Sequence, residues 1–174
     1  MKFEVEQATE ILLRTPKTLS TMFEGLSPAW SAGYEDLNNW SVYDVIGHLI
    51  HGEETDWMPR AEIILAQGES LEFDEFDRTA MFGETDKATF AEQLDKFATL
   101  RRANVEKLLS WRLTEGQLAL KGIHPEFGEV TLEQLISTWV VHDLGHIRQI
   151  VTWMASKYET NVGPWKAYLS ILKK

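Results

Sequence analysis

His142 and His146 are the residues of this sequence whose type and spacing are best suited to chemistry. Positions four residues apart on an α-helix lie nearly one above the other, about 6 Å apart along the axis. Two imidazoles placed in this way can bind the same metal ion, and His-x-x-x-His on a helix recurs in metal sites. A third histidine, His48, lies far upstream and could complete the site.

A buried pair without metal is the alternative interpretation. Both histidines fall on the apolar stripe of a predicted helix, which runs Leu132, Leu135, Trp139, His142, His146, Ile150 and Trp153. In a core each neutral imidazole needs partners, since an unpaired buried polar group costs about 1–3 kcal/mol. With His48 included, three neutral imidazoles would leave coordination positions open, as in catalytic zinc sites. Nickel, iron or manganese could also occupy such a site.

Two further residues are candidates for lining a pocket near these histidines. Trp139 lies one turn before His142 on the same face of the predicted helix, and His51 lies one turn after His48. His51 could equally be a surface residue. No residue stands out as a general base, so the catalytic residues stay unknown at this stage.

Two other residues are interpreted as structural. Arg101 falls on the apolar stripe of the predicted third helix, where its stem would pack while its guanidinium reaches the rim or an acidic partner. An anion clamp for a substrate is the alternative role for Arg101. His124 precedes Pro125 in a predicted loop, which favours local hydrogen bonding over metal ligation. We therefore leave His124 out of the predicted site.

The composition indicates one globular domain over residues 1–174, with 44% apolar residues. The chain has no cysteine, which excludes disulfides, thiolate catalysis and Cys-ligated zinc. Its net charge of −10 and the lack of a Lys/Arg cluster argue against nucleic acid as a partner. We find neither a signal peptide nor an apolar run of about 18 residues, so we expect a cytoplasmic protein without a membrane partner.

Apolar periodicity predicts four long helices and almost no strand. Capping boxes begin the second helix, with Ser41 and Asp44, and the fourth, with Thr131 and Gln134. The predicted elements are a first helix at residues 3–25, bent or split at Pro16; a loop at 27–40; a second helix from Ser41, kinked at Pro59 and ending by Gly68; an irregular connection at 68–85; a third helix at 86–110; a loop at 111–130; a fourth helix from Thr131 to about Tyr158; and a short helix at 165–172.

Short motifs follow one another along almost the whole chain. They are Trp40-Ser41, residues 45–49 (VIGHL), the loop at 124–132 (HPEFGEVTL), residues 142–150 (HDLGHIRQI) and Gly163-Pro164-Trp165. In this combination the sequence resembles the DinB-like superfamily, which includes YfiT-type proteins. The family name derives from DNA-damage-inducible genes and implies no DNA binding.

The resemblance implies an all-α four-helix bundle in an up-down-down-up order, which suits the long connection predicted at 68–85. It also implies a divalent metal, commonly zinc or nickel, held by three histidines that match His48, His142 and His146. Homodimers are common in the family. Its characterised relatives include transferases of the thiols bacillithiol and mycothiol and a mycothiol-dependent maleylpyruvate isomerase.

The leading hypothesis is a metal-dependent enzyme that activates a low-molecular-weight thiol, or water, for transfer to an electrophilic small molecule. A metal-dependent hydrolase is its closest variant. The alternative is a non-catalytic stress-response protein that binds a metal or a small molecule. This alternative predicts a filled interior around the metal, whereas an enzyme needs a cavity that reaches it.

Overall fold

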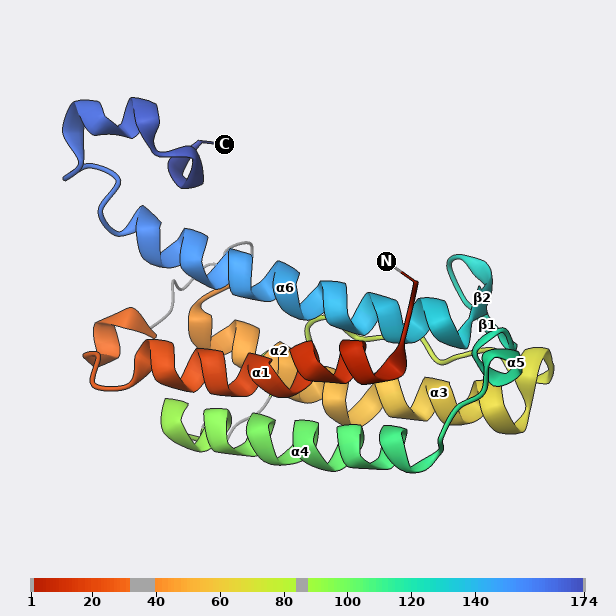
Figure 1. The fold of residues 1–174 in the computed structure, drawn as a ribbon. Helices are drawn as coiled ribbons and strands as arrows, with labels where there is room; N and C mark the ends of the chain where they lie inside the picture. Colours follow the sequence, from red (N-terminus) through yellow and green to blue (C-terminus); the bar gives the residue numbers. More distant parts are fainter. Residues whose placement is uncertain (1, 32–39, 84–87, 174) are drawn as a thin grey trace.

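Four long helical rods account for most of the computed structural model, which describes residues 2–31, 40–83 and 88–173 (Figure 1). α1 contacts α4 and α6, and α2 also contacts α4 and α6, which confirms the predicted all-α four-helix bundle. No described helix is long and apolar enough to cross a membrane. The rods are α1 (Val5–Phe23), α2 (Val42–Thr55) continued by α3 (Trp57–Ala66), α4 (Phe90–Ser110) and α6 (Leu132–Ser156).

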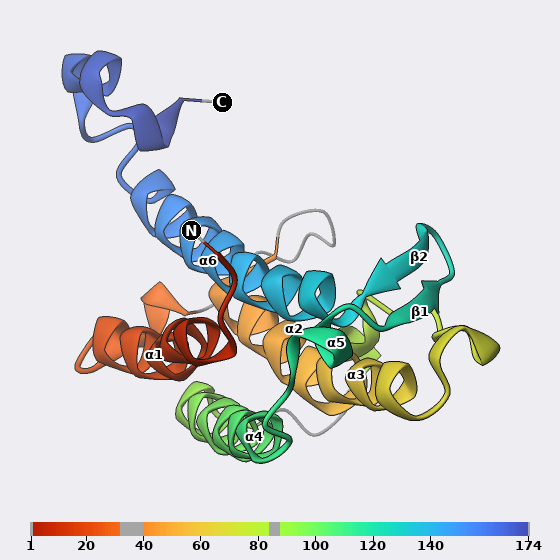
Figure 2. The same ribbon diagram turned by 45° about the vertical axis from the view of Figure 1, so that its right-hand side comes forward.

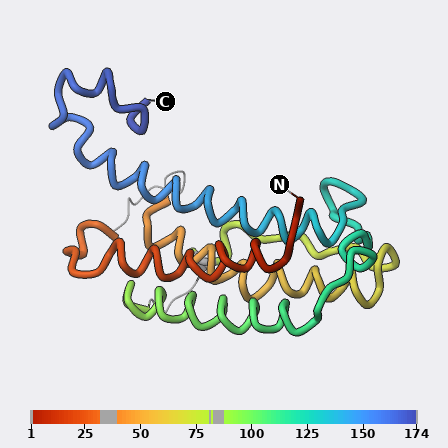
Figure 3. Tube along the Cα trace, viewed as in Figure 1, coloured from red at the N-terminus to blue at the C-terminus, as the bar shows by residue number. Residues whose placement is uncertain are grey.

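The rods follow an up-down-down-up order (Figures 1 and 3). α1 and α6 run in one direction, whereas α2, α3 and α4 run in the other. Because α3 and α4 are parallel, the chain must return along the bundle between them, and residues 67–89 form this crossover. Its described parts include two 3-10 turns, η2 (Gly68–Ser70) and η3 (Ala80–Gly83). The connection predicted at 68–85 is confirmed over these parts, since residues 84–87 lie outside the described residues.

Reciprocal capping boxes begin the two helices that carry the candidate histidines. The backbone N–H of Ser41 donates to Oδ2 of Asp44 at 2.8 Å, and that of Asp44 donates to Oγ of Ser41 at 3.1 Å. Thr131 and Gln134 make the equivalent bonds at the start of α6, at 2.8 and 3.2 Å. Both predicted boxes are confirmed. Each fixes the residue at which its helix begins, and this start sets the face of the helix on which the histidines lie.

Two prolines differ in their effect on the helices. Pro16 lies inside a continuous α1, and its missing amide leaves the carbonyl of Leu12, four positions earlier, without its helical partner. Nη1 of Arg101 donates to that carbonyl at 2.9 Å and replaces the lost bond. The interruption predicted at Pro59 is present in the preceding turn, where α2 and α3 are separated at Asp56 (φ −111°, ψ −72°). Proline has no amide to pair with the carbonyl of Thr55, four positions earlier, and its ring clashes with that carbonyl. Pro59 lies in the first turn of α3, where no backbone amide needs a helical partner.

A short antiparallel hairpin precedes α6 and corrects the prediction that strands are missing. β1 (Lys121–His124) pairs with β2 (Gly128–Thr131), and strands this short show no clear periodicity in the sequence. The hairpin packs closely on the crossover, because a Cβ at Gly122 would lie 2.7 Å from the ring of Phe73. The N–H of Phe73 also donates to the carbonyl of Ile123 at 2.9 Å. These contacts hold the crossover against the hairpin.

Two predicted helix boundaries differ from those in the structure. α4 begins at Phe90, whereas the predicted start near Asp86 lies outside the described residues. After α6 the chain leaves the bundle (Figure 2), and two 3-10 segments, η4 (Gly163–Tyr168) and η5 (Ser170–Leu172), replace the predicted terminal α-helix. Trp165 is 70% exposed, so this segment adds little to the core.

Candidate metal centre

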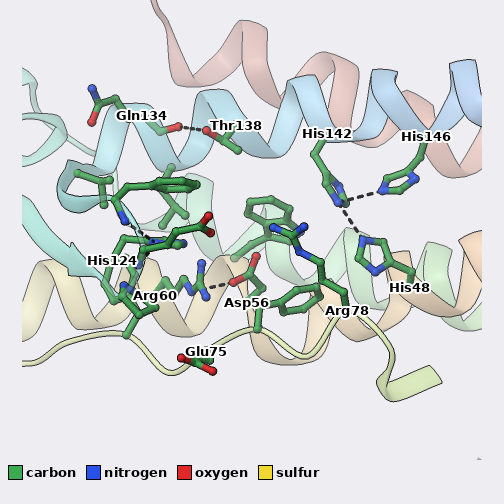
Figure 4. Close-up of a pocket in the computed structure, with 18 of the residues that line it drawn as sticks. His48, Asp56, Arg60, Glu75, Arg78, His124, Gln134, Thr138, His142 and His146 are labelled. Atoms are coloured by element: carbon green, nitrogen blue, oxygen red, sulfur yellow. Dashed lines mark hydrogen bonds and ion pairs between the residues drawn. The ribbon is translucent and has the colours of Figure 1, made fainter. Parts of the chain in front are cut away.

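His48, His142 and His146 meet in one cluster, here called the histidine cluster (Figure 4). α2 and α6 run antiparallel and in contact, which brings His48 opposite the two histidines of α6. Nε2 of His142 lies 3.1 Å from Nε2 of His48 and 3.0 Å from Nε2 of His146. Ring nitrogens of all three residues lie within 4.8 Å of one another. The structure therefore brings together the three histidines that the sequence singled out.

All three imidazoles are neutral near pH 7. Burial, reinforced by neighbouring histidines, lowers the pKa of His48 to about 3 and the pKa of His142 to about 2. Burial also lowers the pKa of His146, although its hydrogen bond with Gln149 acts in the opposite direction. Because a metal binds the unprotonated imidazole, these shifts keep the nitrogen lone pairs available.

The hydrogen bonds of the histidine cluster fit a cation at its centre. Nδ1 of His146 donates to the amide oxygen of Gln149 at 2.8 Å, which leaves the Nε2 lone pair facing His142. The Nδ1 atoms of His48 and His142 are buried and have no hydrogen-bond partner among the described residues. Protons on Nε2 of these two rings would crowd the centre. Protons on Nδ1 instead leave three lone pairs that converge on one point.

The spacing of the nitrogens also fits a metal. Four-coordinate zinc with bonds of about 2.0–2.1 Å holds its ligand nitrogens about 3.3 Å apart. The two close nitrogen pairs in the histidine cluster are 3.0 and 3.1 Å apart. Imidazole suits zinc and nickel among the common divalent ions. Copper and iron also accept imidazole ligands, so the donor set and its spacing fit a divalent cation without deciding which one.

A cavity of about 1030 Å³ reaches the histidine cluster. The cluster is at one end, and the cavity extends past Asp56 and the crossover to the hairpin (Figure 4). Three imidazoles leave open coordination positions, so a ligand in this cavity could reach a bound cation. The other lining residues include aromatic side chains (Trp40, Trp57, Phe73, Phe76 and Phe127) and polar ones (Asp56, Arg60, Arg78, His124, Gln134, Thr138 and Gln149).

Comparison with known proteins agrees with this architecture. A family model described as the DinB superfamily matches residues 11–150. The chain belongs to the DinB superfamily. Among solved structures, the chain is similar to YfiT from Bacillus subtilis, described as a probable metal-dependent hydrolase with an unusual four-helix bundle topology. The TM-score is 0.73 at 20% identity, over 94% of this chain and 90% of that chain, which supports the fold. A comparison with curated proteins found no match.

The two predicted pocket residues of this DinB-superfamily protein lie beside the cavity and not in its lining. The ring of His51 packs on Phe76, which in turn packs on His48, with ring centroids 5.0 and 5.4 Å apart. Trp139 is 2% exposed, and its indole N–H donates to Oε1 of Glu53 at 3.1 Å. Both side chains therefore influence the cavity only through their neighbours.

His124 lines the far end of the cavity, although its position before Pro125 placed it outside the predicted site. Its Nδ1 accepts hydrogen bonds from the amides of Glu126 and Phe127 at 3.1 and 3.4 Å, which confirms the predicted local hydrogen bonding. Its ring stacks on that of Phe127, with centroids 4.5 Å apart. His124 is thus a wall residue of the cavity outside the group of three candidate ligands.

Arg101 of this DinB-superfamily protein has acidic partners, but in the core and not at a rim. It is 1% exposed, and its Nε and Nη2 donate to Glu53 and Asp143 at 3.0 and 2.9 Å. Burial opposes its charge, but the carboxylates of Asp143 and Glu53 outweigh that effect and raise the pKa of Arg101. Arg101 does not line the cavity, so the alternative role as a substrate clamp is wrong.

Several lining residues were not predicted from the sequence. Asp56 and Arg60 form an ion pair at 2.7 Å, which their spacing of four residues could have predicted. Burial raises the pKa of Asp56, and the charge of Arg60 partly offsets that rise. Gln149 lies three positions after a candidate ligand on the same helix and could also have been found. Arg78 lies in the crossover, where no local pattern predicts a place in the site.

Proposed function

We propose that this protein is a metal-dependent enzyme in which His48, His142 and His146 hold a divalent cation, zinc or nickel. It activates a small thiol, or water, for attack on an electrophilic small molecule. The observation that carries the proposal is that three converging lone pairs lie at the wall of a cavity of about 1030 Å³. A non-catalytic metal site that only closes the bundle would have a filled interior there, so the cavity favours the enzyme.

A divalent cation in this position would lower the pKa of a thiol or water molecule that it binds, towards neutrality. The chain supplies the surroundings. Three neutral imidazoles leave the charge of the cation unreduced, and Gln149 holds the proton on Nδ1 of His146, so that Nε2 faces the centre. The rings of Trp40 and Trp57 cover the cluster, with centroids 6.3 Å from His146 and 5.0 Å from His142.

The size of the cavity supports a nucleophile larger than water. Pockets for single small molecules are typically about 300–1,000 Å³. At about 1030 Å³ this cavity is at the upper end of that range, so it has room for a ligand much larger than water. The chain has no cysteine of its own, so a thiol would have to be borrowed. Hydrolysis with water is the variant, supported by the description of YfiT as a probable hydrolase. The homodimer and the cytoplasmic location expected from the sequence stay predictions.

The first test measures metal content in protein without a histidine tag. Wild type, His146→Ala and the control His51→Ala are each supplied with zinc or nickel and then freed of excess metal. We expect a single equivalent of metal in wild type and His51→Ala, and loss of it in His146→Ala. No metal in wild type, even after refolding with divalent ions, would overturn the proposal.

The second test measures reaction in the same three proteins. N-acetylcysteine with 1-chloro-2,4-dinitrobenzene probes thiol transfer, and 4-nitrophenyl acetate probes hydrolysis. We expect at least one reaction to be accelerated more than about tenfold by the metal-loaded wild type and by His51→Ala, but not by His146→Ala. Metal binding with no acceleration of either reaction would support the non-catalytic alternative.

A further inference from the structure

Arg78 is a cation in the cavity without a partner of its own among the described residues. It projects from the crossover into the space between the histidine cluster and the ion pair of Asp56 and Arg60 (Figure 4). Arg60 is engaged, because it pairs with Asp56 at 2.7 Å and donates to the carbonyl of Asp74 at 3.0 Å. Within the described part of the chain, Arg78 makes no hydrogen bond or ion pair. Its guanidinium is therefore available to bind a ligand.

The position of Arg78 lies within electrostatic reach of both ends of the cavity. Burial is the largest cause of the lowered pKa of His48 at one end and of His124 at the other, and the positive charge of Arg78 is a smaller cause at both. Two carboxylates also line the cavity, Glu75 on the crossover and Glu126 at the hairpin end, where its charge acts on His124. Asp56 is already neutralised by Arg60. A cation on three neutral imidazoles would add further positive charge, so the part of the cavity between Arg78 and the histidine cluster favours an anion.

The walls around Arg78 indicate what else the ligand carries. Trp40, Trp57 and Phe76 line the cavity between the histidine cluster and the crossover. Broad aromatic surfaces of this kind bind apolar or aromatic groups. The guanidinium fork matches the geometry of carboxylate or phosphate. Together these features fit an organic anion with an apolar body.

We infer that the substrate of this site is an organic anion, whose carboxylate or phosphate is bound by Arg78 while its apolar body lies against the aromatic wall. That the ligand is a substrate rests on the proposed function, whereas its binding requires only Arg78 and the cavity. Arg78 orients the ligand so that its other end faces the histidine cluster. It is a specificity residue, and the ion pair of Asp56 and Arg60 is part of the wall.

Calorimetric titration of the full chain tests this inference. Phenylacetate and phenyl phosphate are the anionic probes, and phenylacetamide is the neutral counterpart of similar shape. Each is titrated into wild type, Arg78→Gln, Arg78→Lys and the control Arg148→Gln, which removes an exposed arginine outside the cavity. All four proteins are measured both metal-free and zinc-loaded.

We expect at least one anion to bind wild type about tenfold or more tightly than phenylacetamide, as a charge-assisted hydrogen bond allows. Arg78→Gln should lose that preference, Arg78→Lys should keep part of it, and Arg148→Gln should keep all of it. The affinities of phenylacetate and phenyl phosphate, compared with each other, show whether the site prefers a carboxylate or a phosphate. No binding of either anion, or a preference that survives in Arg78→Gln, overturns the inference.

The metal-free arm separates this inference from the proposed function. An anion preference that depends on Arg78, in protein that binds neither zinc nor nickel, would support the inference and refute the proposed enzyme. Zinc binding and catalysis without any anion preference would support the enzyme and refute the inference.

Discussion

Two polar clusters lie side by side in this bundle and differ in how completely their atoms are paired. The first is the histidine cluster. Neighbouring residues of α6, His142 and Asp143, belong to different clusters, since successive helix positions point about 100° apart. The second, here called the Arg101 cluster, consists of Arg101, Glu53, Asn104, Trp139 and Asp143.

The Arg101 cluster satisfies its polar atoms. Nε and Nη2 of Arg101 donate to Oε1 of Glu53 at 3.0 and 2.7 Å, and Nη1 donates to the carbonyl of Leu12 at 2.9 Å. Glu53 also accepts from Asn104 and Trp139 at 3.0 and 3.1 Å. These groups come from α1, α2, α4 and α6, so the cluster ties all four rods together at one level.

The histidine cluster, by contrast, leaves Nδ1 of His48 and of His142 without partners among the described residues, while Nε2 atoms converge. Buried polar groups in native proteins are nearly always paired, so each exception needs a reason. A fully satisfied network stabilises a fold. In the histidine cluster it is the converging Nε2 atoms that indicate a missing cation, because a cation on Nε2 would leave the two Nδ1–H groups unpaired as before. The comparison assigns a structural role to the Arg101 cluster and ligand binding to the histidine cluster.

Arg101→Met is the strongest test of the structural role assigned to the Arg101 cluster. The substitution removes the cation and leaves Glu53 and Asp143 buried without it, and it also removes the donor to Leu12. Removing one partner of a buried ion pair typically costs about 3–5 kcal/mol. We expect a loss of this size in the free energy of unfolding, measured by urea denaturation without metal.

Arg102→Met is the matched control, because Arg102 is the next residue on α4 and is exposed. An exposed substitution of this kind changes the free energy of unfolding by about 0.5 kcal/mol or less. Equal, small losses of unfolding free energy in both variants would mean that the Arg101 cluster does not stabilise the fold. The structural role assigned to this cluster would then be wrong.

The second prediction concerns His142→Leu and has two parts. Without metal, we expect a change of less than about 1 kcal/mol in the free energy of unfolding, because the replaced ring has an unpaired buried nitrogen. With zinc at one hundred times its dissociation constant, wild type should gain about 2.7 kcal/mol and His142→Leu should gain none. Urea denaturation with and without zinc chloride measures both parts.

His51→Leu is the control for that experiment, since His51 lies near the histidine cluster but outside the three candidate ligands. It should keep the full gain from zinc. If zinc stabilised His142→Leu as much as wild type, the ion would be bound elsewhere, and the converging Nε2 atoms would need another explanation.

The histidine cluster was more predictable from sequence than the Arg101 cluster. Spacing on one helix and the apolar stripe are local patterns, and they pointed to His142 and His146 directly. The role of Arg101 depends on Leu12, 89 positions away, whose carbonyl lacks its helical partner because of Pro16. No local rule shows that pairing, so the proline was interpreted as a break in the helix.

The same distinction explains the remaining differences. The capping boxes were predicted correctly, because all their partners lie within three residues. The hairpin was missed because its strands are four residues long, and Arg78 was missed because only the crossover brings it to the cavity. The walls of the cavity come from segments far apart in the chain, so the sequence predicted the candidate ligands but not the pocket.

The smallest expected effect belongs to Gln149, the one hydrogen-bond partner that an Nδ1 atom of the histidine cluster has among the described residues. Gln149→Met should weaken zinc binding about tenfold to a hundredfold, because the ring of His146 loses the acceptor that fixes its tautomer. Gln149→Glu keeps an acceptor and increases the basicity of the ligand, so it should bind zinc at least as tightly as wild type. Competition with a chelating dye measures all three affinities. Equal zinc affinities in all three proteins would mean that the hydrogen bond from His146 to Gln149 does not contribute to zinc binding. His146 would then not differ in this respect from His48 and His142.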